Sequence, residues 1–437
     1  MSLSGSRTFV GFGFGAIQTG LFLYEAGRSG AFGRLVVAEV VPQVVESVRA
    51  SDGFFDVNIA RPGGVDSARV GPVELANPSV EADRTQIVDA IATADEIATA
   101  VPSVDFYSSG DDEASRVASL DRVLADGLCE KVRRGGPPAV VYAAENNNHA
   151  AEILEERVLD CIPEVERAAV QAQVCFVNTV IGKMSGVVAD PQEISGRQLR
   201  TVTPSDSRAL LVEEFNRILI SRIEFGDAGV EFERRLKVFE EKDDLLPFEE
   251  AKLFGHNATH ALGAYIGAGR GVERIDELRD LSGVMPFLRA AFIEESGASL
   301  VDKYAGVDAL FTHVGYQRYT DDLLSRMTNP HLGDLIERVA RDPRRKLGWS
   351  DRLVGTVRLA LQQGNVAPRY ALGAAAALES LQSGENDAVR NGLRDVWNGT
   401  DRDAREETAV LDQIEEGAAR LHEWRESGFG DLELVFS

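Results

Sequence analysis

The stretch Arg7-Thr-Phe-Val-Gly-Phe-Gly-Phe-Gly-Ala-Ile-Gln-Thr-Gly20 decides the fold of this 437-residue chain. Its first six residues form a short apolar run that predicts a β-strand, and the residues from Ile17 to Ala26 predict a helix. Glycines between the two allow a tight turn and let the backbone approach a pyrophosphate resting on the helix N-terminus. Strand, glycine turn and helix in this order predict a dinucleotide-binding α/β unit.

An acidic residue follows at the place that such a unit requires. Glu39 ends the next β-like run, Arg34–Val40. A carboxylate there can bind a ribose 2′-hydroxyl and would repel a 2′-phosphate, which favours NAD over NADP. Gln18 stands where the strict GxGxxG pattern has its last glycine, so a tight turn without a ligand remains the alternative.

Further apolar runs at Val104–Tyr107, Ala139–Ala144 and Val174–Val180 alternate with helix-like segments. This alternation predicts a mostly parallel sheet covered by helices. Apolar residues at three- and four-residue spacing in Leu210–Ile220 and Tyr370–Leu381 predict amphipathic helices instead. We therefore expect an α/β N-terminal Rossmann-type domain, residues 1–195, and a mainly α-helical C-terminal domain, residues 196–437.

Composition excludes several classes of protein. There are 46 Lys and Arg residues against 70 Asp and Glu residues, a net charge of −24, whereas nucleic-acid binding needs clustered basic side chains. The three cysteines have no CxxC spacing, which indicates reduced thiols and no cysteine-based zinc site. The start Met1–Arg7 lacks the features of a signal peptide, and no run of about 18 apolar residues occurs. We expect a cytoplasmic protein with no membrane or nucleic-acid partner.

The segment Lys252–Gly267 contains the largest group of candidate catalytic side chains. On a helix of about 100° per residue, Lys252, His256 and His260 lie near 0°, 40° and 80°, with Asn257 near 140°. Alcohol oxidation needs a base, and a lysine in a partly desolvated pocket has a lowered pKa. Asparagine amides donate hydrogen bonds at every pH, which suits an oxygen that gains negative charge. The alternative is a solvated polar helix face.

A second amide, Asn146, directly follows the predicted strand Ala139–Ala144. Ligands bind at the carboxyl ends of strands in open α/β sheets, although asparagine is also a common turn residue.

The Lys-x4-Asn-x2-His spacing of Lys252, Asn257 and His260 resembles the signature of the long-chain polyol-specific dehydrogenases, the mannitol dehydrogenase family. The amino-acid sequence of Lys252–His260 looks most like that of the branch of this family that acts on mannitol 1-phosphate. Other similar landmarks run along the chain in the same order: the glycine start, Val37–Val40, Val104–Phe106, Ala144–Asn146, Asn329–Pro330, Arg338–Leu347 and Asp351–Leu353.

The resemblance implies an active site without a metal, between a Rossmann-type domain and a helical domain. Lys252 would be the general base, Asn146 and Asn257 would hold the substrate oxygen, and His260 would orient the substrate. His256 has no fixed counterpart in the family and is expected to be structural or supporting. The residues that would contact NAD are Gly13, Gly15, Ala16, Ile17 and Glu39.

One departure from the family pattern concerns Gly182–Lys183, which replaces an expected Asp-Arg pair. Lysine keeps the charge of arginine but loses its planar fork, so substrate choice could differ. Arg344, Arg345, Lys346 and Arg352 are candidates for binding a phosphate ester, although ion pairing with nearby acidic residues is the favoured interpretation.

The expected activity is NAD-dependent interconversion of a polyol phosphate and a ketose phosphate, with mannitol 1-phosphate and fructose 6-phosphate as the leading pair. The expected partner is therefore a small-molecule polyol or sugar phosphate, bound by a monomer or a small homo-oligomer. Two alternatives stay open: a dehydrogenase of an unphosphorylated polyol or hexuronate, and a nucleotide-binding protein without catalysis.

Overall fold

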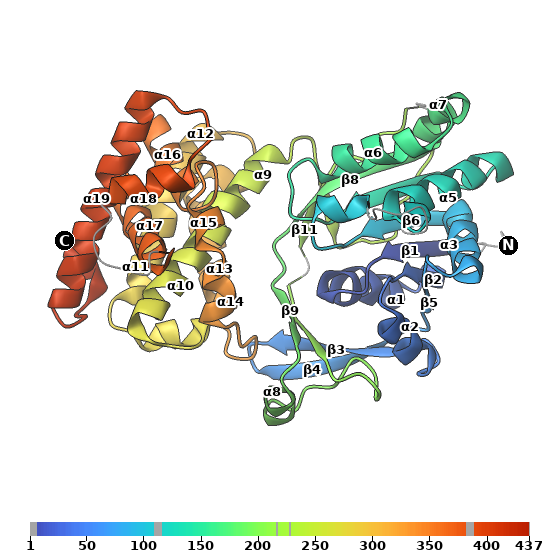
Figure 1. Ribbon diagram of the computed structural model, residues 1–437, viewed down its shortest axis with the longest axis horizontal. Helices are drawn as coiled ribbons and strands as arrows, with labels where there is room; N and C mark the ends of the chain where they lie inside the picture. Colours follow the sequence, from blue (N-terminus) through green and yellow to red (C-terminus); the bar gives the residue numbers. More distant parts are fainter. Residues whose placement is uncertain (1–6, 109–115, 216, 227–228, 382–388, 437) are drawn as a thin grey trace. The chain divides into compact units, whose positions relative to one another are not determined.

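A computed structural model describes residues 7–108, 116–215, 217–226, 229–381 and 389–436 (Figure 1). The chain divides into two compact units, Met1–Leu245 and Leu246–Ser437. Residues 1–6, on which the expected lack of a signal peptide partly rests, lie outside the described residues.

The first unit is built on a large, mostly parallel sheet. In the described part of this unit, its strands lie in the order β12-β11-β8-β7-β6-β1-β2-β5. The six strands from β5 to β8 are parallel, and their order along the chain is that of a dinucleotide-binding Rossmann fold. The bounds are β1 (Arg7–Phe12), β2 (Phe32–Ala38), β5 (Glu74–Ala76), β6 (Ala94–Thr99), β7 (Ala139–Ala143), β8 (Val174–Ile181), β11 (Ile218–Ser221) and β12 (Phe239–Lys242).

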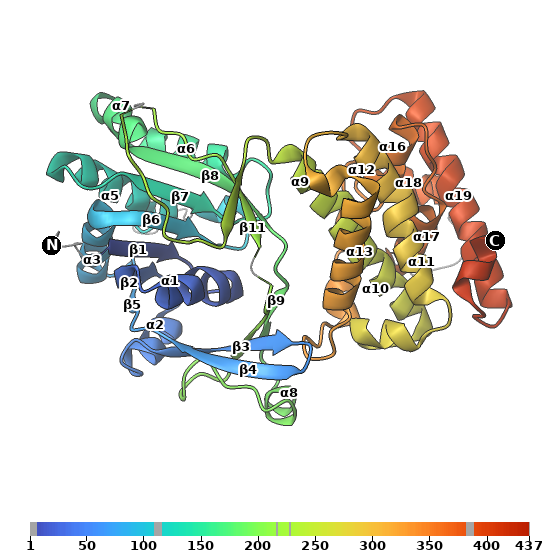
Figure 2. The same cartoon turned by 180° about the vertical axis from the view of Figure 1, so that it is seen from behind.

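Helices cover both faces of this sheet (Figure 1 and Figure 2). One apolar core joins the sheet to α3, α5, α6 and α7, and another joins its opposite face to the helical residues 16–29 and to α2. Both faces are buried, which explains why the strands read as continuous apolar runs. The bounds are α1 (Tyr24–Ser29), α2 (Pro42–Arg49), α3 (Glu81–Thr93), α5 (Leu120–Arg134), α6 (Ala150–Cys161) and α7 (Glu164–Gln173).

A smaller sheet lies against the second of these cores, with the strand order β4-β3-β10-β9. Its central strands, β3 (Phe55–Arg61) and β10 (Ala209–Glu213), are parallel to each other. The flanking strands are antiparallel to them. The remaining bounds are β4 (Gly64–Val70), β9 (Ser185–Val188) and the short helix α8 (Pro191–Gly196).

Two expectations change in this region. The helix expected over Leu210–Ile220 is wrong, because β10 and β11 occupy that stretch. All five residues of β10 are buried, which hides the alternation that marks a strand, so its apolar spacing is equally compatible with a helix. Since β10, β11 and β12 pair with strands of the first unit, residues 196–245 stay with that unit, and the boundary lies after Leu245 rather than at 195/196.

The strand expected at Val104–Tyr107 is also wrong. This stretch is a 3₁₀-helix, begun by Ser103, whose side chain accepts a hydrogen bond from the backbone N–H of Asp105. The parallel strand of this region is β6, Ala94–Thr99. It contains Asp95 and Glu96, which interrupt the apolar run that would otherwise predict a buried strand.

The second unit is helical throughout its described residues, 246–381 and 389–436, apart from turns and one isolated bridge. The helix expected at Tyr370–Leu381 is confirmed as α17. No helix in the described ranges is long and apolar enough to cross a membrane. The α-helices are α9 (Leu246–Glu250), α10 (Ala258–Arg270), α11 (Val284–Ala290), α12 (Ala298–Lys303), α13 (His313–Met327), α14 (Ile336–Ala340), α15 (Pro343–Lys346), α16 (Val354–Gln362), α17 (Pro368–Leu381), α18 (Val389–Val396) and α19 (Ala404–Glu426).

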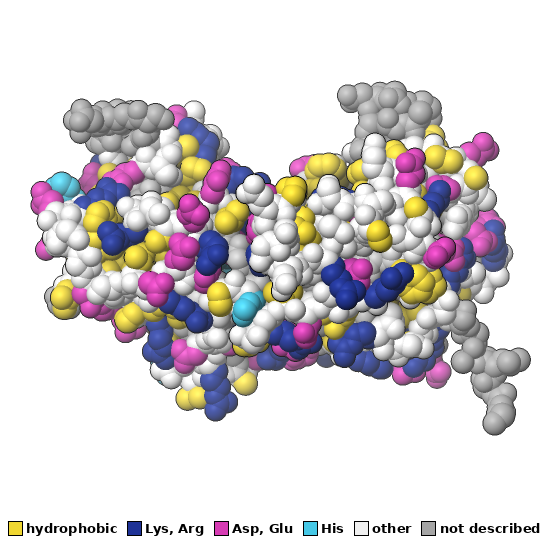
Figure 3. Space-filling view, turned by 90° about the horizontal axis from the view of Figure 1, so that it is seen from below, with side chains coloured by type: hydrophobic (Ala, Val, Ile, Leu, Met, Phe, Trp, Pro, Cys, Tyr) yellow, Lys and Arg dark blue, Asp and Glu magenta, His cyan; other side chains and the backbone are white. Residues whose placement is uncertain are grey.

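Charged side chains are mixed in sign on the surface. Figure 3 shows Lys and Arg side chains interspersed with Asp and Glu side chains over the described part of one face. Many charged side chains of the described residues form ion pairs, such as Arg390 with Asp412 and Glu415.

Candidate functional site

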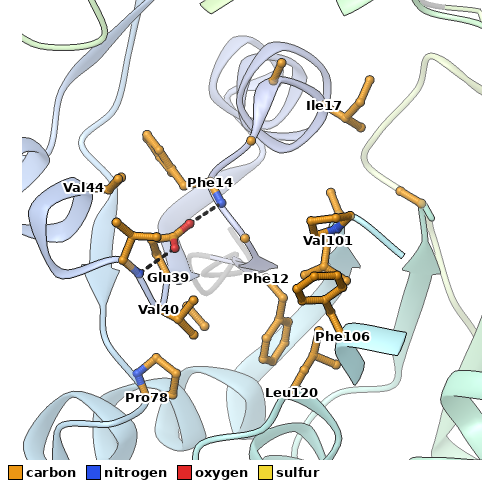
Figure 4. A pocket seen from close by; sticks show the side chains of 18 of the residues that line it. Phe12, Phe14, Ile17, Glu39, Val40, Val44, Pro78, Val101, Phe106 and Leu120 are labelled. Atoms are coloured by element: carbon orange, nitrogen blue, oxygen red, sulfur yellow. Dashed lines mark hydrogen bonds between the residues drawn. The ribbon is translucent and has the colours of Figure 1, made fainter. Parts of the chain in front are cut away.

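A cavity of about 590 Å³ opens at the carboxyl ends of four neighbouring parallel strands of the first unit. Its walls come mainly from the segments after β1, β2, β6 and β7, with Ser185 added from β9 and Arg208 from the loop directly before β10. This is where an open α/β sheet binds ligands. Figure 4 shows Glu39 and Phe14 on one side of the cavity and Val101, Phe106 and Leu120 on the other.

The glycine loop of this cavity leaves room for a ligand. Gly13 has φ +82°, and a Cβ there would lie 2.9 Å from the carbonyl oxygen of Ala100, so only glycine fits without strain. A Cβ on Gly15 would meet no atom within 4 Å. The helix starts at Ala16, so the backbone N–H groups of its first turn lie beside the open space at Gly15. The predicted residues Gly13, Gly15, Ala16 and Ile17 all line the cavity, which therefore fits a dinucleotide.

Glu39 joins the glycine loop to the end of β2. Its Oε2 accepts a hydrogen bond from the backbone N–H of Phe14 at 2.8 Å, and its Oε1 accepts one from that of Val41 at 2.8 Å (Figure 4). A carboxylate oxygen has two acceptor positions, so each can also receive a ribose hydroxyl. Glu39 thus shapes the loop in addition to lining the cavity.

Gln18, the departure from the glycine pattern, is fully buried and lies against β1. A Cβ on Gly11 would overlap its side-chain amide. In the strict pattern, the last glycine lets the helix pack closely on the strand. Here Gln18 takes the place of that glycine, and Gly11 on the strand provides the space instead. The amide atoms of Gln18 have no hydrogen-bond partner among the described residues.

Asn146 lies in an exposed turn two residues beyond Ala144, which lines the cavity. The residue between them, Glu145, is buried and fixes this turn: its carboxylate accepts hydrogen bonds from the Thr99 hydroxyl at 2.9 Å and from the backbone N–H of Val101 at 2.9 Å. A third hydrogen bond comes from the Tyr107 hydroxyl. Burial raises the pKa of Glu145, which these hydrogen bonds partly oppose. Glu145 lies beside the predicted amide Asn146, but its role in holding the turn is not apparent from the sequence.

In the second unit, the predicted base and amide lie on a π-helix, Ala251–Asn257, that continues directly into α10. The estimate of 100° per residue therefore fails for this stretch. A π-helix closes i→i+5 hydrogen bonds, so residues five apart lie nearly above one another. Lys252 and Asn257 are five apart, and the wide turn brings them onto the same side more closely than an α-helix would. His260 follows one turn later on α10.

Burial and, to a smaller extent, the positive charge of Arg352 lower the pKa of Lys252 to about 8, while Glu249 opposes the change. A lysine with this pKa is partly neutral near physiological pH and can accept a proton. His256 lies on the same helix, and burial together with the neighbouring cations holds the pKa of its imidazole well below its usual range. His256 is 6% exposed, which supports the expectation that it does not contact a substrate.

His260 lies beside a carboxylate that sequence analysis missed. Its Nε2 is 3.1 Å from Oδ2 of Asp334, whose other oxygen binds Arg338. The sequence gives little indication of this carboxylate, because Asp334 lies between the family landmarks Asn329–Pro330 and Arg338–Leu347 and belongs to neither.

The candidate phosphate-binding side chains differ in availability. Arg344 pairs with Asp395 at 2.6 Å and Arg345 with Asp342 at 3.0 Å, as the ion-pair interpretation predicts. Lys346 is buried and donates to the carbonyl oxygen of Arg341. Arg352 binds Asp351 through Nε alone, and within the described residues its two Nη groups make no hydrogen bond.

Lys183, which replaces the expected arginine, is buried. Its Nζ donates to the carbonyl oxygens of Glu213 at 2.5 Å and of Phe215 at 3.0 Å. These hydrogen bonds connect the segment after β8 to the end of β10, so Lys183 has a structural role in the first unit.

Within the described ranges, no three His, Cys, Asp or Glu side chains gather in a way that could hold a metal ion. The three cysteines are free thiols.

Comparison with known proteins agrees with this architecture. Residues 7–234 match the mannitol dehydrogenase Rossmann domain, and residues 244–424 match the mannitol dehydrogenase C-terminal domain. Among solved structures, a D-sorbitol dehydrogenase in substrate-free form has a TM-score of 0.75 at 16% identity, covering 99% of this chain and 96% of that one. Mannitol 2-dehydrogenase of Pseudomonas fluorescens, a ternary complex with NAD and D-mannitol, has a TM-score of 0.70 at 15% identity and covers 100% and 96%. These two likenesses establish the fold.

Relatives by sequence include mannitol-1-phosphate 5-dehydrogenases. That of Bacillus licheniformis is 29% identical over 359 residues, 82% of this chain and 84% of the relative. That of Pseudarthrobacter chlorophenolicus is 30% identical over 372 residues, 84% of each. Since the family models span both units, the chain belongs to the mannitol dehydrogenase family of NAD-dependent oxidoreductases.

Proposed function

We propose that this protein interconverts a polyol phosphate and a ketose phosphate with NAD, and that mannitol 1-phosphate and fructose 6-phosphate are its leading pair. The observation that carries the chemistry is the π-turn that holds Lys252, with a pKa of about 8, beside Asn257 and one turn before His260. The phosphorylated substrate is supported by the similarity to mannitol-1-phosphate 5-dehydrogenases along most of the chain.

Each residue has one task in the proposed reaction. Gly13, Gly15, Ala16, Ile17 and Glu39 line the cavity that would hold NAD, which when bound would supply the hydride acceptor. Neutral Lys252 accepts the hydroxyl proton at Nζ, so the carbon–oxygen single bond becomes a carbonyl as the C–H and O–H bonds break. In the reverse direction the Lys252 ammonium returns that proton.

Two amides and an imidazole position the substrate. Asn146 and Asn257 donate hydrogen bonds to the substrate oxygen, whose partial negative charge is greatest in the transition state. His260 binds a neighbouring hydroxyl and so fixes which carbon faces the hydride acceptor.

Arg352 is the proposed phosphate ligand. Its Nη groups make no hydrogen bond in the described part of the chain, and a guanidinium can bind phosphate through two parallel hydrogen bonds. Arg352 also influences the pKa of Lys252, which places its charge near the base. Arg344 and Arg345 are engaged with carboxylates and are the matched comparison.

The test is NADH oxidation with a panel of ketoses, ketose phosphates and hexuronates, compared by kcat/KM. Fructose 6-phosphate should exceed fructose by a large factor, and Arg352→Gln should remove most of that advantage, whereas Arg344→Gln should not. Lys252→Ala should abolish turnover and leave NADH binding, measured by fluorescence titration, nearly unchanged. Equal kcat/KM for free and phosphorylated sugars would favour the unphosphorylated alternative, and NADH binding without turnover of any substrate would favour the non-catalytic one.

A further inference from the structure

Asp334 is a buried carboxylate in the loop between α13 and α14, and its side chain is only 1% exposed. The backbone holds it in place, because its carbonyl oxygen accepts a hydrogen bond from the N–H of Ile275 at 2.9 Å. The neighbouring residue Leu335 forms a bridge to Arg274. Asp334 is thus fixed against the segment that follows α10, the helix that carries His260.

The two oxygens of Asp334 have different partners. Oδ1 accepts hydrogen bonds from Nε and Nη2 of Arg338, at 2.8 and 2.5 Å. Oδ2 lies 3.1 Å from Nε2 of His260, and within the described residues both of these buried atoms lack any other hydrogen-bond partner. Burial opposes a charge on this carboxyl, but the His260 ring and Arg338 lower its pKa, so the carboxylate is charged.

Leaving a buried charged oxygen without a hydrogen bond is unfavourable, so the proton of a neutral His260 is strongly favoured on Nε2, which lies 3.1 Å from Oδ2. A neutral imidazole has one donor and one acceptor nitrogen. With the proton on Nε2, Nδ1 becomes the acceptor nitrogen. Polyols carry a hydroxyl donor on nearly every carbon, which is what such a nitrogen can bind.

We propose that Asp334 is a positioning residue that holds His260 in the Nε2–H tautomer, so that Nδ1 accepts a hydrogen bond from a substrate hydroxyl. This inference rests on the proposed function for the identity of the substrate. Arg338 completes the arrangement by occupying the other carboxylate oxygen, which keeps Oδ2 directed at the imidazole. The rival explanation is that Asp334 only anchors its loop through Arg338.

The decisive variant is Asp334→Asn. Its amide oxygen can still accept from Arg338, but an amide NH₂ then faces Nε2 and favours the Nδ1–H tautomer, which removes the acceptor. The chain has six histidines, so long-range ¹H–¹⁵N correlation spectra of histidine-labelled protein can be resolved, with His260 assigned by the loss of its signals in His260→Gln. We expect Nε2–H in the wild type and Nδ1–H in Asp334→Asn.

Kinetics supply the second measurement. In metal sites, loss of the group that orients a ligating imidazole lowers metal affinity or activity by about 10–100-fold. We expect Asp334→Asn to raise KM for the sugar phosphate by a similar factor and to leave KM for NADH unchanged. Glu416→Gln is the matched control, because Glu416 also pairs with an arginine one helical turn away, Arg420 at 2.7 Å. It should change neither the tautomer nor KM.

A double-mutant cycle separates positioning from anchoring. In the His260→Gln background, Asp334→Asn should have almost no further effect on KM, because the group through which it acts is gone. An unchanged tautomer in Asp334→Asn, or additive effects in the double variant, would overturn the proposal. Failure of the proposed function is recognised separately, as a lack of turnover by the wild type, and the tautomer measurement still decides whether Asp334 sets the state of His260.

Discussion

Replacement of Lys252 by methionine should abolish turnover and yet stabilise the second unit. Burial lowers the pKa of this lysine from 10.5 to about 8, so the folded state carries the charged form at a cost. Methionine has a similar length and no charge to desolvate. The substitution therefore removes that cost while removing the proposed base.

The pKa change sets the size of the effect. At 1.36 kcal/mol per pH unit, a decrease from 10.5 to about 8 corresponds to about 3 kcal/mol. The unfolded state binds more protons than the folded state between pH 8 and 10.5, so wild-type stability rises with pH in that window. The advantage of Lys252→Met should therefore be about 3 kcal/mol at pH 7 and fall to about 1.4 kcal/mol at pH 9.5.

Tryptophan fluorescence during urea unfolding measures this, because Trp349, Trp397 and Trp424 all lie in the second unit. Lys303→Met is the control: Lys303 pairs with Glu250 at 2.7 Å, and its loss should cost at most about 1 kcal/mol with activity retained. A Lys252→Met chain that is less stable than the wild type at pH 7, or whose advantage does not shrink toward pH 9.5, would refute the reasoning.

Four further outcomes are expected. In the pH profile of alcohol oxidation, kcat/KM should rise about tenfold per pH unit and level off above about 8, because Lys252 must be neutral to accept the proton. Gly255→Ala should destabilise the second unit by about 1–3 kcal/mol in urea unfolding and lower kcat, since its Cβ would overlap buried aromatic rings. Gln18→Gly should lower the thermal midpoint by leaving a void beside Gly11 and should not tighten NADH binding in fluorescence titrations. Glu39→Gln should raise the ratio of kcat/KM for NADPH to that for NADH, because it removes the charge that repels a 2′-phosphate.

The sequence predicts the architecture of the first unit where local rules suffice. The strands β1, β2, β7 and β8 are confirmed close to their expected bounds, because each is a short apolar run bounded by turn residues or helices. Those rules fail for β10 and β11, whose pairing depends on strands far away in the chain. The predicted position of the domain boundary differs from the observed one for the same reason. Long-range strand pairing, rather than local composition, keeps residues 196–245 in the first unit.

The residue types of the candidate site come from the sequence and stay a prediction, whereas their local geometry could not be predicted. The Lys-x4-Asn-x2-His spacing selects Lys252, Asn257 and His260 as candidates, but the periodicity used to place them assumed an α-helix, and Lys252 and Asn257 lie on a π-helix. Nothing in that segment signals an i→i+5 turn. Asp334 is not apparent from the sequence either, because its relation to His260 exists only after α10 and the loop before α14 pack together.

Packing with a second π-helix explains why the wide turn at Lys252 persists. A Cβ on Gly255 would lie 2.5 Å from Cε2 of Phe292 and 2.6 Å from the hydroxyl of Tyr316. Phe292 itself lies on the π-helix Ala291–Gly297, and a Cβ on its last residue, Gly297, would lie 2.7 Å from the Tyr316 ring. Two π-helices therefore share one aromatic pair, Phe292 and Tyr316, whose ring centroids are 5.5 Å apart and whose planes are nearly perpendicular. An α-helical turn would move Gly255 relative to these rings, so contacts distant in sequence, rather than helix propensity, set the spacing of Lys252 and Asn257.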